Sequence, residues 1–370
     1  MGGTALGFQA KRLNKSEYET MYARVARNLC DLASIPTANA ERHLHDPEFV
    51  RDTLIVTLIP SYRQKADFGD MDVLLQAEPE VIQRIREKTG EVFPDWSGDI
   101  YSNGEVASVG IKVPGGVAQL DIIYTGTDCQ RHSAAYSYFA YNDLGNLIGR
   151  LAHRMGFKFG HTGLSYTLRD EASNHVYGEY HFDMSHGDIL GFLGLDPARY
   201  MAGFDTLEDI FEFVASSPYF HPDIYLLDNV NAVSRIRDKK RKTYMTFLDW
   251  LEKRGPQETD LVLDADGKKK FKEFMLRSTM LADHVFADWV QEVQFSHSEA
   301  QYAKLFWNGG LVMNWTGLKG KELGEFITEF RTFVEGDSTL SFNEWAILMG
   351  CKAKDFTLDF YVNDWKDRKR

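Results

Sequence analysis

The sequence predicts an α+β fold, because it combines short strand-like runs with longer amphipathic segments. The runs are rich in Val, Ile and Leu and have the composition of buried strands. The longer segments repeat apolar residues at helical spacing, and after about Asp228 the pattern is mainly helical and rich in Trp and Phe. The expected strands are 53–59, 70–76, 106–112 and 117–124, and the expected helices are 15–32, 79–89, 141–155 and 206–215.

Local signals indicate where several of these elements begin and end. Asn14 or Ser16 is placed to cap the first helix, because both side chains accept hydrogen bonds from free backbone N–H groups. The run Pro114-Gly115-Gly116 is typical of a turn and separates the third and fourth strands. Gly156 ends the helix over 141–155. The chain shows no internal repeat and no low-complexity linker.

Composition limits the class of protein. With 44% hydrophobic and 13% aromatic residues, the 370-residue chain can form a sizeable core, so we expect a globular protein. No apolar stretch is long enough to predict a membrane span, and the first residues lack a secretory pattern. Three scattered cysteines argue against a disulfide framework and against a zinc site. We therefore expect a cytoplasmic protein with no membrane partner, whose oligomeric state the sequence does not indicate.

Three acidic residues point to a metal site. Asp70 and Asp72 follow Gly69 and lie two apart on a predicted strand, so their carboxylates face the same side and repel unless a cation lies between them. Asp121 interrupts the apolar strand V-A-Q-L-D-I-I-Y, where an unpaired carboxylate is costly. If the two strands are neighbours, the three carboxylates form an oxygen-rich site suited to two Mg²⁺ or Mn²⁺ ions.

The residues around these carboxylates resemble those of the family X DNA polymerases, the nucleotidyltransferases related to DNA polymerase beta. G-D-M-D-V-L-L at Gly69 to Leu75 is similar to the strand of the family's first two aspartates, and Q-L-D-I-I to that of its third. Residues 136–157 resemble the family's Tyr-Phe-Thr-Gly-Ser-Asp segment and the helix after it. Residues 204–214 resemble its closing nucleotide-binding motif. The resemblance covers roughly residues 50 to 225.

This resemblance implies a division of the chain. Residues 51–135 would form a polymerase-beta-like palm, a small mixed sheet flanked by helices. Residues 136–228 would form a thumb-like nucleotide-binding subdomain. A short N-terminal helical segment, 1–50, would precede the palm, and a mainly α-helical C-terminal lobe, 229–370, would follow without a counterpart in the family.

The resemblance also implies an enzyme that transfers a nucleotide from an NTP or dNTP to a hydroxyl and releases pyrophosphate. Asp70, Asp72 and Asp121 would be its catalytic and metal-binding residues. The nucleotide would contact the β- and γ-phosphate ligands Ser61, Arg63 and Gly69, the sugar-side pair Tyr138 and Phe139, and the base-side residues Asp143 and Asn146. Arg150, on the same helix as Asn146, would contact the template side.

Three positions depart from the family's pattern. Pro60 stands where Gly precedes the phosphate-binding Ser, so that turn loses a backbone donor. Gln64 stands where a second Arg is usual, and the loop is one residue shorter. Tyr141 replaces the Gly of the sugar-side turn, which would alter the choice between ribose and deoxyribose.

The acceptor is less well defined than the chemistry. A nucleic-acid 3′ end, such as a DNA primer or a tRNA-like end, is the first expectation. Its predicted contacts are Arg150, Arg235, Arg237, Lys240 and Arg241. The formal charge of −12 and the absence of the family's fingers before the palm favour instead a small molecule or a protein side chain. A third possibility is an inactive fold that acts as a binding module. If nucleic acid is not bound, the basic run R-I-R-D-K-K-R-K is a solvated helix face.

Overall fold

The computed structural model describes residues 5–32, 55–87, 89–170, 173–255, 265–337, 340–350 and 357–369. The chain divides into two compact units. Unit 1 combines Met1–Tyr166 with His181–Ser278, and unit 2 combines Thr167–Tyr180 with Thr279–Arg370. The division therefore does not fall at 228, because residues 229–278 belong to unit 1. Within the predicted N-terminal segment, residues 33–50 lie outside the described residues.

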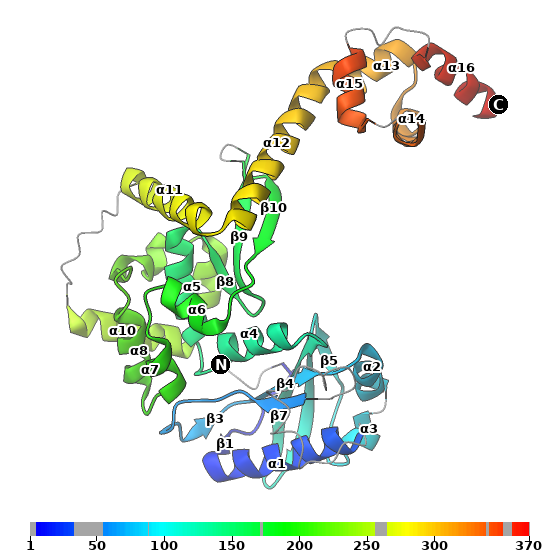
Figure 1. The fold of residues 1–370 in the computed structure, drawn as a ribbon. Helices are drawn as coiled ribbons and strands as arrows, with labels where there is room; N and C mark the ends of the chain where they lie inside the picture. Colours follow the sequence, from blue (N-terminus) through cyan, green and yellow to red (C-terminus); the bar gives the residue numbers. More distant parts are fainter. Residues whose placement is uncertain are drawn as a thin grey trace. The chain divides into compact units, whose positions relative to one another are not determined.

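The sheet of unit 1 has five strands in the order β2-β4-β7-β6-β5 (Figure 1). The central pair, β4 and β7, is parallel, whereas the other neighbouring pairs are antiparallel. The sheet is therefore mixed, and the predicted α+β class is confirmed. The strands are β2 (Ile55–Leu58), β4 (Met71–Gln76), β5 (Tyr101–Asn103), β6 (Val106–Val113) and β7 (Gly116–Gly126). Of the predicted strand 53–59, residues 53 and 54 lie outside the described residues.

Alternation along β4 and β7 divides their side chains between the two faces of the sheet. Met71 and Val73 belong to the larger core cluster, which also contains Leu120 and Ile122. The intervening residues point to the opposite face, where Leu74 and Ile123 pack with α4 (Cys129–Phe139). Since side chains alternate along a strand, Asp72 and Asp121 lie on this second face.

Helices cover both faces of the sheet, and Figure 1 shows α1 and α4 on opposite sides of it. The predicted first helix is confirmed as α1 (Lys15–Leu32), and its cap is Asn14. The Asn14 side chain accepts from the Glu17 amide at 3.0 Å, and the Glu17 carboxylate accepts from the Asn14 amide at 3.0 Å. This reciprocal pair satisfies two backbone donors at the helix end. On the same face lie α2 (Pro79–Glu87) and α3 (Thr89–Val92).

A short left-handed turn connects α4 to α5 (Leu144–Met155). The predicted helix over 141–155 begins three residues later than expected, because Tyr141 and Asn142 have φ of 58° and 66°. After the turn, Gly145 allows the two helices to approach closely. A Cβ at this position would lie 2.1 Å from the carbonyl oxygen of Tyr138. At the other end, Gly156 terminates α5 with φ 94°, as predicted.

The remaining elements of unit 1 are mainly helical. A capping box formed by Thr206 and Asp209 begins α8, so the predicted helix over 206–215 is confirmed. Strand β8 (Lys158–Gly160) pairs with the start of β9 (Gly163–Arg169), and β1 (Leu13–Asn14) with β3 (Asp67–Phe68). The other helices are α6 (His186–Phe192), α7 (Pro197–Ala202), α8 (Leu207–Ala215), η4 (Pro222–Ile224), η5 (Leu227–Asn229), α9 (Ala232–Asp238) and α10 (Lys242–Arg254).

Unit 2 contains the later part of β9, most of β10 and a helical region with its own aromatic core. Trp307 stacks on Phe330 at a centroid distance of 5.0 Å, and Trp345 meets Phe330 edge-on at 5.3 Å. These rings belong to a separate core cluster. Besides β10 (Val176–His181), the helices of unit 2 are α12 (His284–Phe306), α13 (Gly309–Thr316), α14 (Gly320–Asp337), α15 (Phe342–Gly350) and α16 (Thr357–Lys369). They follow α11 (Ala265–Ala282), most of which belongs to unit 1. Among the described helices, none is both long and apolar enough to cross a membrane.

The core of the sheet generates the first prediction. Leu120 is 0% exposed, so Leu120→Ala removes buried apolar surface and leaves a cavity between the sheet and α1. We expect the free energy of unfolding, measured by urea titration, to fall by about 2–5 kcal/mol. Met201→Ala is the control, because Met201 is 78% exposed, and it should change the free energy by less than about 0.5 kcal/mol. Equal effects of both changes would contradict the assigned core.

Candidate active site

The structure brings the three predicted carboxylates together. Asp72 and Asp121 are direct neighbours in the register of the parallel strands β4 and β7. Asp70 precedes β4, and carboxylate oxygens of all three residues lie within 4.8 Å of one another. Among the described residues, no other group of three or more Asp, Glu, His or Cys side chains has the spacing of a metal site. The strands hold it in place, because the residues between the aspartates are anchored in the core.

The electrostatics of the site favour a cation. Burial raises the pKa of Asp72 well above its usual range, and the charges of Asp70 and Asp121 raise it further. Burial also raises the pKa of Asp121, against hydrogen bonds from Ser108 and Gln119 that lower it. In both residues the charged form is disfavoured without a counter-ion, and a divalent cation would supply one.

Gln119 and Ser108, which the sequence reasoning did not single out, orient the third carboxylate. The Gln119 side chain donates to both oxygens of Asp121, at 3.0 and 2.9 Å. Its own carbonyl accepts from the Ala5 amide at 2.9 Å. Ser108 lies directly across from Asp121 in the register of β6 and β7. These contacts fix the direction in which Asp121 presents its oxygens. The alternation of the Q-L-D sequence would have placed Gln119 on the same face as Asp121.

Lys65 is a second functional candidate that sequence reasoning missed. Its ammonium contacts Asn142 Oδ1 at 3.2 Å and lies 4.7 Å from the centre of the Phe68 ring. Burial lowers its pKa, while the charges of Asp70 and Asp72 raise it. Lys65 therefore places a positive charge near the carboxylates. Its position in the short polar loop before Gly69 was the available signal.

The predicted phosphate-binding loop follows β2 and reaches the sugar-side turn. Ser61 is partly exposed and Gly69 is buried. The carbonyl of Pro60 accepts from the Tyr141 amide at 2.7 Å, so the loop is tied to the end of α4. Arg63 forms an ion pair with Asp205 at 2.5 Å, and both side chains are more than half exposed. An exposed pair of this kind contributes little to stability, so a more highly charged phosphate can compete for Arg63.

The predicted sugar-side residues lie at the end of α4, a helix that the sequence pattern did not reveal. Tyr138 meets Phe139 edge-on, at a centroid distance of 5.2 Å. Phe139 also lies against His161 at 6.1 Å. Tyr141 packs edge-on against Tyr200 and Phe204, at 5.3 and 4.9 Å. Tyr141 thus combines a left-handed backbone, with φ of 58°, with two edge-on aromatic contacts.

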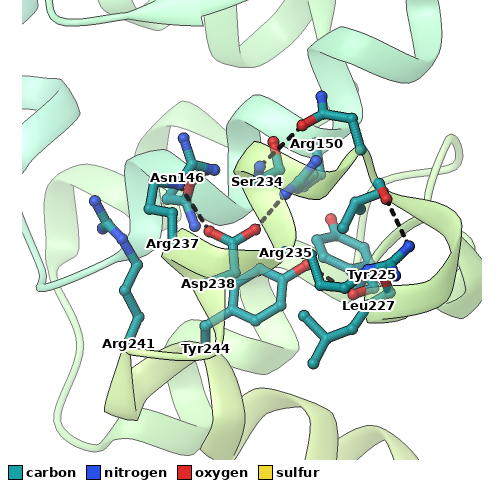
Figure 2. A network of polar contacts seen from close by, with 12 residues as sticks. Asn146, Arg150, Tyr225, Leu227, Ser234, Arg235, Arg237, Asp238, Arg241 and Tyr244 are labelled. Atoms are coloured by element: carbon teal, nitrogen blue, oxygen red, sulfur yellow. Dashed lines mark hydrogen bonds and ion pairs between the residues drawn. The ribbon is translucent and has the colours of Figure 1, made fainter.

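Three of the predicted base-side and nucleic-acid residues, Asn146, Arg150 and Arg237, are joined with Asp238 in a polar network (Figure 2). Asp238, at the end of α9, is fully buried and forms ion pairs with Arg150 and Arg237. Arg237 also donates to Asn146 Oδ1 at 3.1 Å. At the start of α5, Asp143 forms an ion pair with Arg241. The basic run therefore folds back against α5. Arg241 neutralises Asp143 at the start of that helix, and Arg237 neutralises Asp238 within the run itself.

The other two predicted nucleic-acid residues differ from each other. Arg235 donates through Nε to the Leu227 carbonyl at 2.8 Å and through Nη2 to the Val230 carbonyl at 3.2 Å. Its guanidinium therefore stabilises the turn before α9. Lys240 is exposed in the turn between α9 and α10. Among the predicted contacts in this run, Arg237 and Lys240 are exposed as expected of phosphate ligands, although Arg237 is also paired with Asp238.

Burial and mutual repulsion in the acidic triad generate the second prediction. Because the folded state raises the pKa values of Asp72 and Asp121, the free energy of unfolding falls as the pH rises from the ordinary aspartate value of about 3.9 through the raised values. Asp72→Asn removes the buried charge. In EDTA its melting temperature should exceed that of the wild type at neutral pH, and the difference should close as the pH approaches about 4.

The same thermal scan with added Mg²⁺ provides the internal control. Ligand binding to the folded state raises the melting temperature, so Mg²⁺ should stabilise the wild type more than Asp72→Asn. Two results together would contradict a cation site: the wild type melts at the same temperature in EDTA and in Mg²⁺, and Asp72→Asn has the same stability as the wild type.

The chain matches no protein-family model, and no curated protein is similar to it in sequence.

Proposed function

We propose that the chain is a Mg²⁺-dependent nucleotidyltransferase of the polymerase-beta type. The observation that supports this best is the acidic triad, in which two neighbouring parallel strands bring three carboxylates within 4.8 Å of one another. The donor set consists of hard oxygen ligands, which suit Mg²⁺ or Mn²⁺, and the raised pKa values indicate an uncompensated negative charge. The residues therefore fit a site for two such ions.

In the proposed reaction, a hydroxyl oxygen of the acceptor attacks the α-phosphorus of an NTP or dNTP. The bond from that phosphorus to the oxygen bridging the α- and β-phosphates breaks, and pyrophosphate leaves. Asp70 and Asp72 would hold the ions that contact the triphosphate. Asp121, oriented by Gln119, would hold the ion next to the acceptor hydroxyl or accept its proton. The bound ions would supply charge neutralisation and activate the hydroxyl.

The rest of the proposed nucleotide site lies around the same end of the sheet. Ser61, Arg63 and the backbone of Gly69 would bind the β- and γ-phosphates, after the exposed pair of Arg63 with Asp205 opens. Lys65, which the charges of Asp70 and Asp72 already influence, is a further phosphate ligand in this proposal. The aromatic residues at the end of α4 would contact the sugar.

A nucleic-acid 3′ end remains the first proposed acceptor. One observation favours the second candidate, a small molecule or a protein side chain. Arg150, Arg235, Arg237 and Arg241, four of the predicted nucleic-acid contacts, are hydrogen-bonded or ion-paired within unit 1. Contacts with a phosphate backbone would have to displace these partners or use the exposed lysines.

One experiment separates these readings. The protein is incubated with labelled NTPs or dNTPs and Mg²⁺, with DNA, with tRNA or with no nucleic acid. Label on nucleic acid supports the first acceptor, and label on the protein itself supports a side chain. No transfer and no nucleotide binding would contradict the proposed activity. Nucleotide binding without transfer would favour the binding module.

The third prediction concerns the triad. Asp72→Asn and Asp121→Asn should each lower the transfer rate by a factor on the order of a thousand, because each removes a ligand that acts on the transition state. The chain offers a matched control in Asp67→Asn, since Asp67 is exposed and pairs with Arg12. The control should keep near-normal transfer. A triad variant as active as Asp67→Asn would remove that aspartate from the site.

The fourth prediction concerns the sugar. Tyr141→Gly allows the left-handed φ of 58° without a side chain and removes bulk near the proposed 2′ position. We expect the ratio of dNTP to NTP use to change by about tenfold, on the scale of 1–3 kcal/mol for a changed pocket contact. Tyr141→Phe retains the ring and should retain the ratio. Equal ratios in both variants and the wild type would place Tyr141 outside the sugar pocket.

A further inference from the structure

A small open pocket with both polar and apolar walls lies in unit 1, between α5, β8 and α9. Its volume is about 180 Å³, roughly six times the volume of a water molecule in the liquid. The polar residues of its lining are Asn146, Arg150, His153, Lys158, Ser234 and Arg237, and none of the lining residues is acidic. None of the three triad carboxylates lines it, but Tyr138 and Asn146 do, so the pocket adjoins the proposed nucleotide site without including its acidic residues.

Two donors in the lining have no protein acceptor. Arg150 uses Nη2 to bind Asp238, while its buried Nε has no hydrogen-bond partner. Asn146 uses Oδ1 to accept from Arg237, while its buried Nδ2 also has none. Buried donors in folded proteins are generally paired. Two unpaired N–H groups on one helix, one turn apart, therefore point to an acceptor that enters from outside the chain.

The charges favour an anionic acceptor. The guanidinium groups of Arg150 and Arg237 share the one buried carboxylate of Asp238, so this part of the lining retains one excess positive charge (Figure 2). Guanidinium groups bind phosphate oxygens with paired hydrogen bonds, and the Ser234 hydroxyl adds a neutral donor. The walls contributed by Phe157 and Phe159 limit the space around the anion to a compact group.

We propose that this cavity binds the phosphate group of a ligand. The group is either free, as a small phosphate-bearing molecule, or the terminal phosphate of a nucleic-acid strand. In both cases its oxygens accept from Arg150, Asn146, Arg237 and Ser234. Asp238 holds the two guanidinium groups in position. The basic run of α9 thus has a defined binding function beside its role in packing.

The test measures binding in EDTA, so that the acidic triad contributes nothing and the result is independent of the proposed transferase activity. The full chain is titrated calorimetrically with inorganic phosphate, with a 5′-phosphorylated oligonucleotide and with the same strand ending in a 5′-hydroxyl. Binding of inorganic phosphate alone supports a small ligand. Preference for the phosphorylated strand over the hydroxyl strand supports a strand end.

Two variants locate the binding. Arg237→Gln should weaken phosphate binding by at least about tenfold, as expected for a hydrogen bond with a charged group. Because Arg237 also neutralises Asp238, Ser234→Ala is a second variant without that role, and it should weaken binding severalfold. Lys239→Gln, one position beyond α9 and outside the lining, removes the same charge and should leave phosphate affinity within about twofold.

His153 provides a spectroscopic readout within the cavity. In the free protein, partial burial and the charges of Lys272 and Arg150 lower the pKa of His153. A bound phosphate should raise this pKa in an NMR titration of the imidazole. No binding of any probe would overturn the proposal. Phosphate binding that stays unchanged in both Arg237→Gln and Ser234→Ala would also overturn it. The same holds if both oligonucleotides bind equally well and Lys239→Gln weakens that binding.

Discussion

The repulsion among Asp70, Asp72 and Asp121 is the constraint on which the proposed site depends. The sheet prevents the carboxylates from separating, because the residues beside them are fixed in the core and the register of β4 and β7 is set by backbone pairing. Local interactions reduce the repulsion instead. Asp121 accepts hydrogen bonds, the ammonium group of Lys65 lies nearby, and the raised pKa values favour protonation of Asp72 and Asp121. A fold that maintains such a charge cluster uses core stability to do so, as expected if the proposed cation binds there.

Asp238 is a second buried acidic residue that constrains unit 1, on the helical side formed by α5 and α9. A fully buried carboxylate is stable only when it is paired, and here two guanidinium groups share it. The pairing connects α9 to α5 within one compact unit, into which α10 also packs through Phe247 against Phe211. A helix that looks like a solvated basic face in the sequence is therefore partly an internal structural element.

The sequence predicted the elements whose residues follow a regular alternation. The strands around Asp72 and Asp121 could be located because short runs of Val, Ile and Leu are typical of buried strands. The spacing of Asp70 and Asp72, two residues apart, predicted that their side chains share a face. Helix α4 was missed because its polar residues and alanines give no clear apolar stripe. The Asp238 network was not predictable, since it joins residues far apart in the chain. Lys65 and Gln119 carried local signals, but their partners Asn142 and Ala5 are likewise distant in sequence.

The close approach of α4 and α5 at Gly145 has a consequence for mutational scanning. Every L-amino acid other than glycine would place its Cβ within 2.1 Å of a main-chain carbonyl oxygen, so the turn that carries the aromatic residues would have to open. Such a position would tolerate no replacement in a saturation library, although it offers no side chain to any ligand. Sensitivity at Gly145 would therefore reflect the close packing of α4 and α5. A map of positions that tolerate no substitution would then overestimate the number of residues that take part in catalysis or binding.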